Sequence, residues 1–298
     1  MKLRQIEYAL QVARTLSFRL AAEQLGVTQP TLSNGLSAFE QELGGRLFER
    51  TTRDVSLTAF GGHMLPFLQA VIEDRDMLLQ AARAYRDPSL KLLRIGLSPL
   101  ADLKTIERSL APFRQMFPEV KIYFKECLVD DLNERLLNDK LDIGLRVKET
   151  LPEGLTRQPA YREPVYYLPQ EELQPANSPR PLQISELPEV PIICTSGACG
   201  LNKALEAIFA EAGRDLHIYP GQALSYQAIE EWTELGIGAG ILPYAKLSSG
   251  NVTASPLIGA EGAPVEFSYE WVFRKAVAST TPPHILKFRE QIKSMAKV

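Results

Sequence analysis

Hydrophobic residues recur at helical spacing in three short stretches at the start of the chain. The first stretch spans residues 3–14, and its apolar side consists of Leu3, Ile6, Leu10 and Ala13. The second follows Ser17, with an apolar side of Ala21, Ala22 and Leu25. The third starts near Gln29, and its apolar side consists of Leu32, Leu36, Phe39 and Leu43. This periodicity predicts three helices around one small core.

Capping residues mark the ends of the second and third helices. Ser17 is a predicted N-cap, and Gly26 supplies the left-handed residue that ends the second helix. Thr28 caps the third helix, where Pro30 occupies the first turn and its missing N–H costs little. The Gly44-Gly45 pair ends that helix. The two helices are therefore joined by a tight turn.

The outer face of the third helix is polar but uncharged. It consists of Gln29, Thr31, Ser33, Asn34, Ser37 and Gln41. A solvated helix face ordinarily carries Lys and Glu, whereas short amides and hydroxyls allow close approach to another polar surface. The major groove of double-stranded DNA accepts such a helix, and Asn or Gln can form two hydrogen bonds to an adenine edge.

A small hairpin is predicted after the third helix, from residues 46–50 and 55–57 with a tip at 51–54. Arg50 and Arg53 lie in this hairpin. An arginine there can reach phosphates or the minor groove beside the helix.

The run QPTLSNGLSAFEQELGGRLFERTTRDVSLTAFG resembles the winged helix-turn-helix of the LysR-type transcriptional regulators in order and spacing. A helical hairpin packed inside an enzyme core is the alternative interpretation, but it leaves the polar face unexplained. We therefore expect a DNA-binding domain over residues 1–57. The expected DNA-contacting residues are Thr28, Gln29, Pro30, Thr31, Ser33, Asn34, Ser37, Arg50 and Arg53.

A long helical stretch follows, capped by Thr58 and ended by Asp87-Pro88. Its 4-3 hydrophobic spacing is typical of a coiled-coil seam and comprises Met64, Leu68, Val71, Arg75, Leu78, Ala82 and Tyr85. A charged Arg75 on the seam is expected to fix register, and Pro66 to kink or reset the first turns. We expect residues 58–88 to be a linker helix that pairs two copies in a homodimer. An amphipathic helix lying on its own domain is the alternative.

The rest of the chain alternates between apolar strands and amphipathic helices. The first unit has strands at 92–97, 120–126 and 141–147 and helices at 102–117 and 130–138. The second has the run VYYLP, strands at 191–194, 216–219 and 238–242, and helices at 201–212 and 226–235. Strand 266–274 and helix 283–295 are expected to return to the first unit. This alternation predicts an α/β fold with a parallel, doubly wound sheet.

This half also resembles the LysR-type family, through LLRIGLS, LNDKLDIGLR and ELGIGAGILP. The resemblance implies a two-lobed, Rossmann-like effector domain over residues 89–298, similar to periplasmic solute-binding proteins. Lobe 1 is expected at 89–161 and 266–298, and lobe 2 at 162–265. A small-molecule effector is expected in the cleft between them, and a dimer or tetramer as the assembly.

Two loops at the carboxyl ends of strands are candidates for holding a small anion, Ser98-Pro99-Leu100 and Thr195-Ser196. Plain helix capping is the alternative for each. Arg146 is the obvious nearby cation. Asp102 argues against an anion, because its carboxylate, in the first turn of the helix after Ser98, already interacts with the positive end of that helix. An anionic and a zwitterionic effector therefore both stay open. With Tyr226, added by resemblance, the candidate effector-binding residues are Ser98, Pro99, Leu100, Asp102, Arg146, Thr195, Ser196 and Tyr226.

Composition agrees with a globular protein of 298 residues, 45% hydrophobic, with a net charge of −3. Residues 1–60 hold seven basic and six acidic side chains, so DNA affinity needs positioned contacts made twice rather than a broad basic surface. No apolar stretch approaches a membrane span of about 20 residues, and the start lacks a signal-peptide pattern. With three cysteines, an odd number without a C-x-x-C motif, we expect a cytoplasmic protein.

Other functional classes have less support. The chain lacks G-x-S-x-G and P-loop motifs, and the G-I-G-A-G run at 236–240 enters a strand rather than leaving one. The three histidines lack metal-ligand spacing. We therefore expect no catalytic residue, metal or cofactor. Cys199, among small residues near a helix start, leaves one alternative for the sensing step, which is thiol-based redox sensing.

Overall fold

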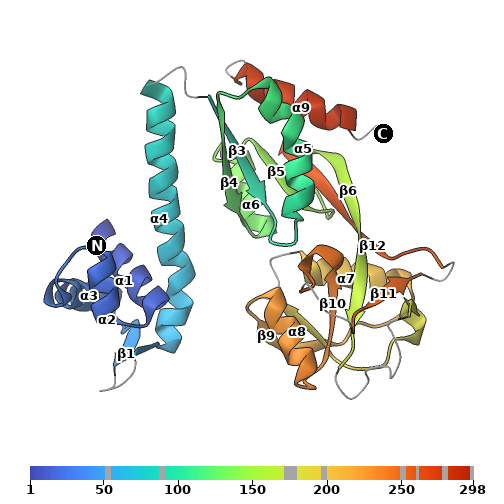
Figure 1. Ribbon diagram of the computed structural model, residues 1–298, viewed down its shortest axis with the longest axis horizontal. Helices are drawn as coiled ribbons and strands as arrows, with labels where there is room; N and C mark the ends of the chain where they lie inside the picture. Colours follow the sequence, from blue (N-terminus) through green and yellow to red (C-terminus); the bar gives the residue numbers. More distant parts are fainter. Residues whose placement is uncertain are drawn as a thin grey trace. The chain divides into compact units, whose positions relative to one another are not determined.

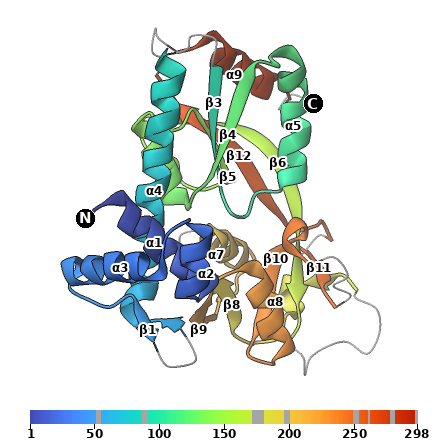
Figure 2. The same cartoon turned by 60° about the vertical axis from the view of Figure 1, so that its left-hand side comes forward.

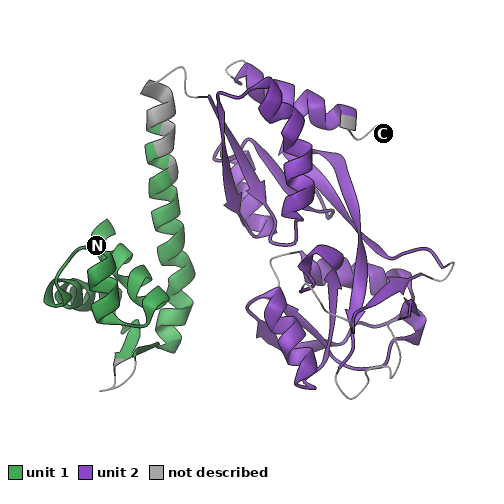
Figure 3. Ribbon diagram, in the orientation of Figure 1, with its two compact units in different colours: residues 1–89 green, residues 90–298 purple. Residues whose placement is uncertain are grey.

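The computed structural model describes residues 1–50, 55–86, 91–170, 180–195, 200–248, 253–259, 262–276 and 281–295. The chain forms two compact units, Met1–Ser89 and Leu90–Val298 (Figure 3).

Three helices form the core of the first unit, as the periodicity predicts. They are α1 (Leu3–Thr15), α2 (Phe18–Gln24) and α3 (Gln29–Leu43). Ser17 and Thr28 cap α2 and α3 by accepting hydrogen bonds from the N–H groups of Leu20 and Thr31, both at 3.3 Å. The left-handed glycines are also confirmed, with φ of +65° at Gly26 and +75° at Gly44.

Close packing of α1 against α3 depends on Gly35. A Cβ atom at this position would lie 2.9 Å from the ring of Tyr8, which is nearer than real Cβ contacts. Glycine therefore lets the buried Tyr8 ring press against the backbone of α3. This contact helps to fix the orientation of α3.

The predicted hairpin consists of β1 (Phe48–Arg50) and β2 (Val55–Leu57), which pair antiparallel with Phe48 opposite Leu57. Glu40 of α3 connects the helix to this hairpin, because its carboxylate accepts hydrogen bonds from the N–H of Leu47 at 2.8 Å and of Phe48 at 3.3 Å. The hairpin tip, residues 51–54, lies outside the described residues.

Helix α4 (Ala59–Arg86) is a single helix, and it includes Pro66. The helix is therefore not reset at Pro66, and a kink there stays a prediction. Thr58 caps the helix as expected, since its hydroxyl accepts a hydrogen bond from the N–H of Gly61 at 2.8 Å.

The predicted seam of α4 needs a correction. Leu68 is buried against the core of the first unit, and Met64 packs there too. Arg75 forms ion pairs with Glu7 of α1 and, at 2.9 Å, with Asp76. Its charge is therefore paired within one chain, and the register of a coiled coil is not needed to explain it. Among the side chains of α4 that the structure describes, the large apolar ones exposed to solvent are Phe67, Val71, Leu78 and Leu79.

The second unit contains two lobes, seen one above the other in Figure 1. Lobe 1 has a parallel core of β4 (Val120–Glu126), β3 (Lys91–Leu97) and β5 (Ile143–Val147). Helices α5 (Leu103–Met116) and α9 (Pro283–Met295) pack together on it, with the rings of Phe113 and Phe288 4.9 Å apart (Figure 2). Helix α6 (Val129–Leu137) packs its leucines over the strand glycines Gly96 and Gly144.

Lobe 2 is built on β10 (Ala239–Pro243), β8 (Ile192–Thr195) and β9 (Ile218–Ala223), with parallel pairing of β8 to both neighbours. Its helices are α7 (Leu201–Glu211) and α8 (Tyr226–Glu234). Shorter elements complete it, namely β7 (Leu182–Gln183), η2 (Ile184–Glu186), η4 (Tyr244–Lys246) and β11 (Ser255–Ile258).

Two long strands cross between the lobes. Strand β6 (Leu155–Leu168) pairs antiparallel with β12 (Glu266–Arg274) up to Pro164, and with β10 from Val165 onward. The predicted parallel layout is confirmed for β3, β4 and β5, whereas the returning strand β12 is antiparallel to both β5 and β6. The crossing strands make the hinge between two halves of one unit.

Candidate functional site

The outer face of α3 is exposed to solvent, while its inner face is fully buried. Leu32, Leu36 and Phe39 are each 0% exposed. The residues that lie open to solvent are Thr28, Gln29, Pro30, Thr31, Asn34, Ser37 and Gln41, and Ser33 is half-buried. Packing of this polar strip inside the protein is therefore ruled out.

Most of the strip's hydrogen-bonding groups face outward unused. The hydroxyls of Thr28 and Thr31 bond to each other at 2.8 Å. Over the part of the chain that the structure describes, the side chains of Gln29, Asn34 and Ser37 make no hydrogen bond to the protein. Their donors and acceptors can therefore meet a second polar surface without first breaking internal bonds.

A groove of about 580 Å³ lies between the end of α3 and the hairpin. Ser37, Gln41 and Arg46 are among its lining residues. Arg46 is an exposed cation held beside the strip, and its carbonyl accepts a hydrogen bond from Thr58 at 2.5 Å. Sequence reasoning counted Arg46 only as part of the net charge. Its position directly after Gly44-Gly45, at the helix–hairpin junction, was the available signal.

Several expected site residues cannot be placed. Arg53, Ser196 and Cys199 lie outside the described residues. Arg50 belongs to β1, but only its backbone is described.

In the second unit, Ser98 follows the end of β3 and is buried. Its hydroxyl accepts a hydrogen bond from the N–H of Leu100 at 3.3 Å, which shapes the turn. Leu100 is 0% exposed, and its carbonyl accepts a hydrogen bond from the hydroxyl of Tyr269 at 3.0 Å. The side chain of Leu100 therefore supports the loop from inside, while Pro99 is half-exposed.

Asp102 caps α5, as its position predicts. Its carboxylate accepts hydrogen bonds from the N–H groups of Lys104 and Thr105, each at 3.0 Å. Burial raises the pKa of Asp102, but these bonds and one from the Thr105 hydroxyl outweigh it and hold the pKa below its ordinary value. The carboxylate is thus ionised, and its oxygens already accept hydrogen bonds from the first turn of α5.

Arg146 is not the ligand-facing cation that the sequence indicated. Its side chain is 0% exposed, and it forms ion pairs with Glu149 and Glu270, both at 2.9 Å. It also donates to the carbonyl of Thr150 at 3.3 Å. Two carboxylates of the protein therefore neutralise its charge, as burial of a guanidinium requires.

Across the hinge, Thr195 ends β8 and Tyr226 begins α8. Lys246 of η4 lies over the Tyr226 ring, with its Nζ 5.8 Å from the ring centre. The same Nζ donates a hydrogen bond of 3.0 Å to the carbonyl of Ala101, beside Asp102 in lobe 1. Lys246 therefore reaches from lobe 2 to the Ser98–Asp102 loop.

Sequence reasoning missed Lys246. The only available signal was a lysine shortly after the buried strand of residues 239–243, at the edge where carboxyl ends of parallel strands gather ligands.

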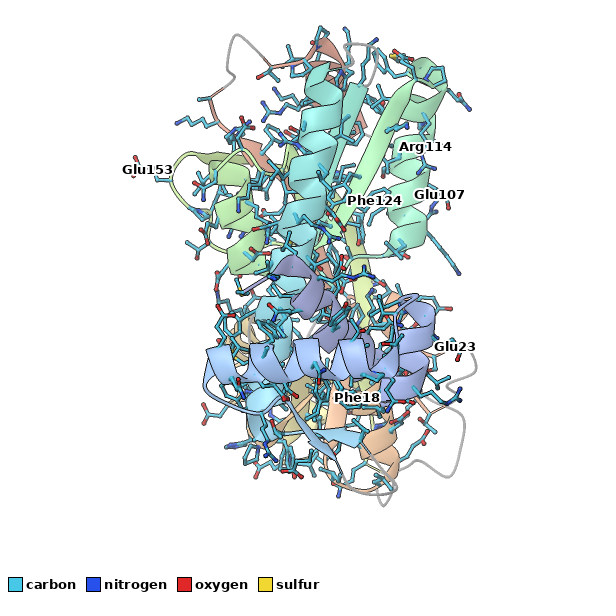
Figure 4. The ribbon with its side chains drawn as sticks, turned by 90° about the vertical axis from the view of Figure 1, so that its left-hand side faces the viewer. Phe18, Glu23, Glu107, Arg114, Phe124 and Glu153 are labelled. Carbon is cyan, nitrogen blue, oxygen red and sulfur yellow. The ribbon has the colours of Figure 1, made fainter. Side chains whose placement is uncertain are left out.

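A cavity of about 750 Å³ lies between α5, β6 and η4. Asp102 is the one expected effector residue in its lining, which also includes Tyr161, Glu163, Tyr244 and Glu107. Figure 4 labels Glu107, which projects from α5. Ser98, Tyr226 and Lys246 are not among the residues that line it.

Two of the three cysteines lie among the described residues. Cys127 and Cys194 are both buried, and burial raises the pKa of the Cys127 thiol to about 12. Among the described residues, no cluster of His, Cys, Asp and Glu side chains could hold a metal ion. No helix in the described part of the chain is long and apolar enough to cross a membrane.

Comparison with known proteins gives two family matches. Residues 3–62 match the "Bacterial regulatory helix-turn-helix protein, lysR family", and residues 87–296 match the "LysR substrate binding domain". The transcriptional regulator IlvR of Caulobacter vibrioides is 29% identical over 248 residues, covering 82% of each chain. The dual regulator OxyR of Escherichia coli is 28% identical over 244 residues, covering 82% of this chain and 79% of OxyR.

Solved structures show the same fold. The crystal structure of CbnR, a LysR family transcriptional regulator, matches with a TM-score of 0.60 at 19% identity over all of both chains. Two matched domains together span nearly the whole sequence, and the geometry of both units agrees with them. The chain therefore belongs to the LysR family of DNA-binding transcriptional regulators with an effector-binding domain.

Proposed function

We propose that α3 inserts into the major groove and reads base edges with Gln29, Thr31, Ser33, Asn34 and Ser37. The observation that carries this proposal is the exposed, uncharged strip on a helix whose opposite face is fully buried. Thr28 and Pro30 set the start of the helix against the DNA backbone, while Arg46, Arg50 and Arg53 supply phosphate or minor-groove contacts.

A mobility-shift assay with DNA from upstream of the protein's own gene tests this proposal. We expect a retarded complex at moderate salt that survives an excess of unrelated competitor DNA. Arg46→Ala should weaken binding to all sequences by a similar factor, because phosphate contacts carry no sequence information. Absence of any retarded complex, even without competitor, would refute the proposal.

We propose a homodimer in which the exposed apolar residues of α4, Phe67, Val71, Leu78 and Leu79, pack against a second copy. These side chains are 37–67% exposed, an unusual amount for large apolar groups on one helix. Two DNA-binding units then read two half-sites about one helical turn apart. We also propose that dimers pair into tetramers. The protein then acts in the cytoplasm on chromosomal DNA.

We propose that the cleft between the lobes of residues 89–298 binds a small-molecule effector. Its walls are the loop Ser98-Pro99 on lobe 1 and Thr195, Ser196 and Tyr226 on lobe 2. The β6 and β12 strands allow the lobes to move about the hinge, so an effector that prefers one lobe arrangement shifts the population of states. Residues 1–57 form the DNA-binding domain. Residues 58–88 form the linker helix that pairs the two copies.

A thermal-shift screen of small metabolites against the full chain tests this part. A compound that binds the folded state raises the melting temperature, and its stabilisation grows with the logarithm of its concentration over its Kd. We expect the effect of a hit to be lost when Thr195→Val removes the hydroxyl from the cleft wall. A hit unaffected by Thr195→Val, and equally by Tyr226→Phe and Ser98→Ala, would place the binding site elsewhere.

A further inference from the structure

Lys246 occupies an unusual position for a lysine, since it is half-buried at the junction of two lobes. Its element, η4, directly follows the carboxyl end of β10 in lobe 2. Its ammonium reaches the carbonyl of Ala101 in lobe 1 at 3.0 Å and lies over the ring of Tyr226 at 5.8 Å. Two proposed cleft walls are therefore bridged by one cation.

The ammonium has hydrogen-bonding capacity to spare. A lysine side chain has three N–H donors, and the Ala101 carbonyl takes one of them. Among the described residues, no carboxylate forms an ion pair with Lys246. Lys246 thus differs from Arg146, whose charge is neutralised by Glu149 and Glu270.

The carboxylates around Lys246 are mostly committed elsewhere. Burial lowers the pKa of Lys246, while Glu126, Glu163 and Asp102 act in the opposite direction. Asp102 caps α5 with both oxygens, and one oxygen of Glu163 accepts a hydrogen bond from the N–H of Ala245 at 2.6 Å. Glu126 is exposed to solvent at the end of β4. These three carboxylates thus act on Lys246 from a distance, and among the described residues none of them forms an ion pair with its ammonium.

We propose that Lys246 is the residue that recognises the effector, and that the effector carries a carboxylate. This inference rests on the proposed function of the cleft and goes beyond it by naming the cation and the ligand class. A carboxylate that enters beside Ser98 and Tyr226 takes the free N–H donors of Lys246 as charge-assisted hydrogen bonds. Because Lys246 also contacts Ala101, the bound carboxylate links both lobes.

The test measures binding to the full chain by calorimetry and thermal shift, with matched pairs of probes. Each pair consists of a small carboxylate and its primary amide, namely acetate and acetamide, succinate and succinamide, benzoate and benzamide, and glycine and glycinamide. We expect at least one carboxylate to bind while its amide does not. Lys246→Gln should weaken that binding about ten-fold or more, and Lys246→Arg should retain most of it.

Lys121→Gln is the matched control, since it removes the same charge from an exposed position on β4. We expect it to leave the affinity unchanged. Melting temperatures of the unliganded variants show whether each protein is folded.

The outcomes separate the two proposals. Carboxylate binding that is equal in wild type and Lys246→Gln, or amides that bind as tightly as carboxylates, would overturn the role of Lys246 but leave the effector cleft standing. If no carboxylate probe binds while neutral metabolites still do, the role of Lys246 is likewise overturned and the effector cleft still stands. If neither these probes nor any metabolite binds the full chain, both proposals fail.

Discussion

At the scale of single residues, Glu163 is a buried carboxyl group on one of the two crossing strands. It is 7% exposed, on the strand that crosses between the lobes. Burial raises the pKa of Glu163 above the ordinary carboxyl value, although the hydrogen bond from Ala245 opposes the shift. Since the folded state disfavours the charged form, this carboxyl favours folding at low pH and loses that contribution as pH rises through its folded pKa.

Glu163→Gln should therefore stabilise the protein relative to wild type more at pH of about 8 than at pH of about 4. The glutamine keeps an oxygen to accept from Ala245 but cannot ionise. Thermal unfolding of both proteins across this range measures the difference. Glu206→Gln, an exposed position on α7, is the control. A difference in melting temperature that is the same at both pH values would contradict the assignment.

Local chemistry explains which residues the sequence could predict. Ser17 and Thr28 were identifiable because their partners lie three positions away in the chain. Arg146 was misjudged because its partner Glu270 lies 124 positions away, in a strand whose pairing no local pattern reveals. Lys246 was overlooked for the same reason, since its acceptor Ala101 lies 145 positions away.

At the scale of elements, the hairpin is attached to α3 through the Glu40 carboxylate. Glu40→Ala would leave the N–H groups of Leu47 and Phe48 without this acceptor. We expect a loss of about 1–3 kcal/mol in the free energy of unfolding of the first unit, together with weaker DNA binding. Urea denaturation measures the loss. Glu49→Ala, an exposed position in β1, should cost less, and equal costs would refute the attachment.

The α4 helix shows how one hydrophobic repeat can serve two surfaces. The 4-3 spacing was present, but the first unit uses Leu68 and Met64 for its own core, which a coiled-coil pattern cannot distinguish from a partner's surface. Val71 and Leu78 of the predicted seam stay exposed for pairing, and Phe67 is exposed beside them.

Leu78→Glu should accordingly weaken the dimer, because a carboxylate would have to be desolvated in the contact. Sedimentation equilibrium should show dimer dissociation at least about ten-fold stronger than in wild type, a cost of about 1.4 kcal/mol. Gln69→Glu introduces the same charge at another exposed position of α4 and should leave the dimer intact. An unchanged Leu78→Glu dimer would exclude this face as the contact.

Strand β6 shows the limit of local patterns. No strand was predicted for its first ten residues, which Pro159 and Pro164 interrupt, yet they pair with β12 along their length. The helices and buried strands of both lobes were predicted within a few residues, since each has its own periodicity. The crossing was predicted only as a return of the chain, without its antiparallel pairing.

At the scale of the whole molecule, one unit presents an exposed, hydrogen-bonding strip, and the other consists of two lobes joined by the long strands β6 and β12. The family match and the exposed polar strip of α3 both support DNA binding. The net charge of the protein gives little support for it. Regulation then requires that effector binding in the second unit change how two copies of the first are presented to DNA, which is a coupling between two sites.

The most direct test of the account is the ratio of affinities for the upstream DNA site and for a shuffled DNA of equal length, measured by fluorescence anisotropy. We predict that Asn34→Ala lowers this ratio by about 1–3 kcal/mol of discrimination. Gln24→Ala, which removes an amide of α2 bonded to Gln11 and Arg14, should leave it unchanged. A ratio unaffected by Asn34→Ala, with affinity for both DNAs intact, would contradict base reading by α3.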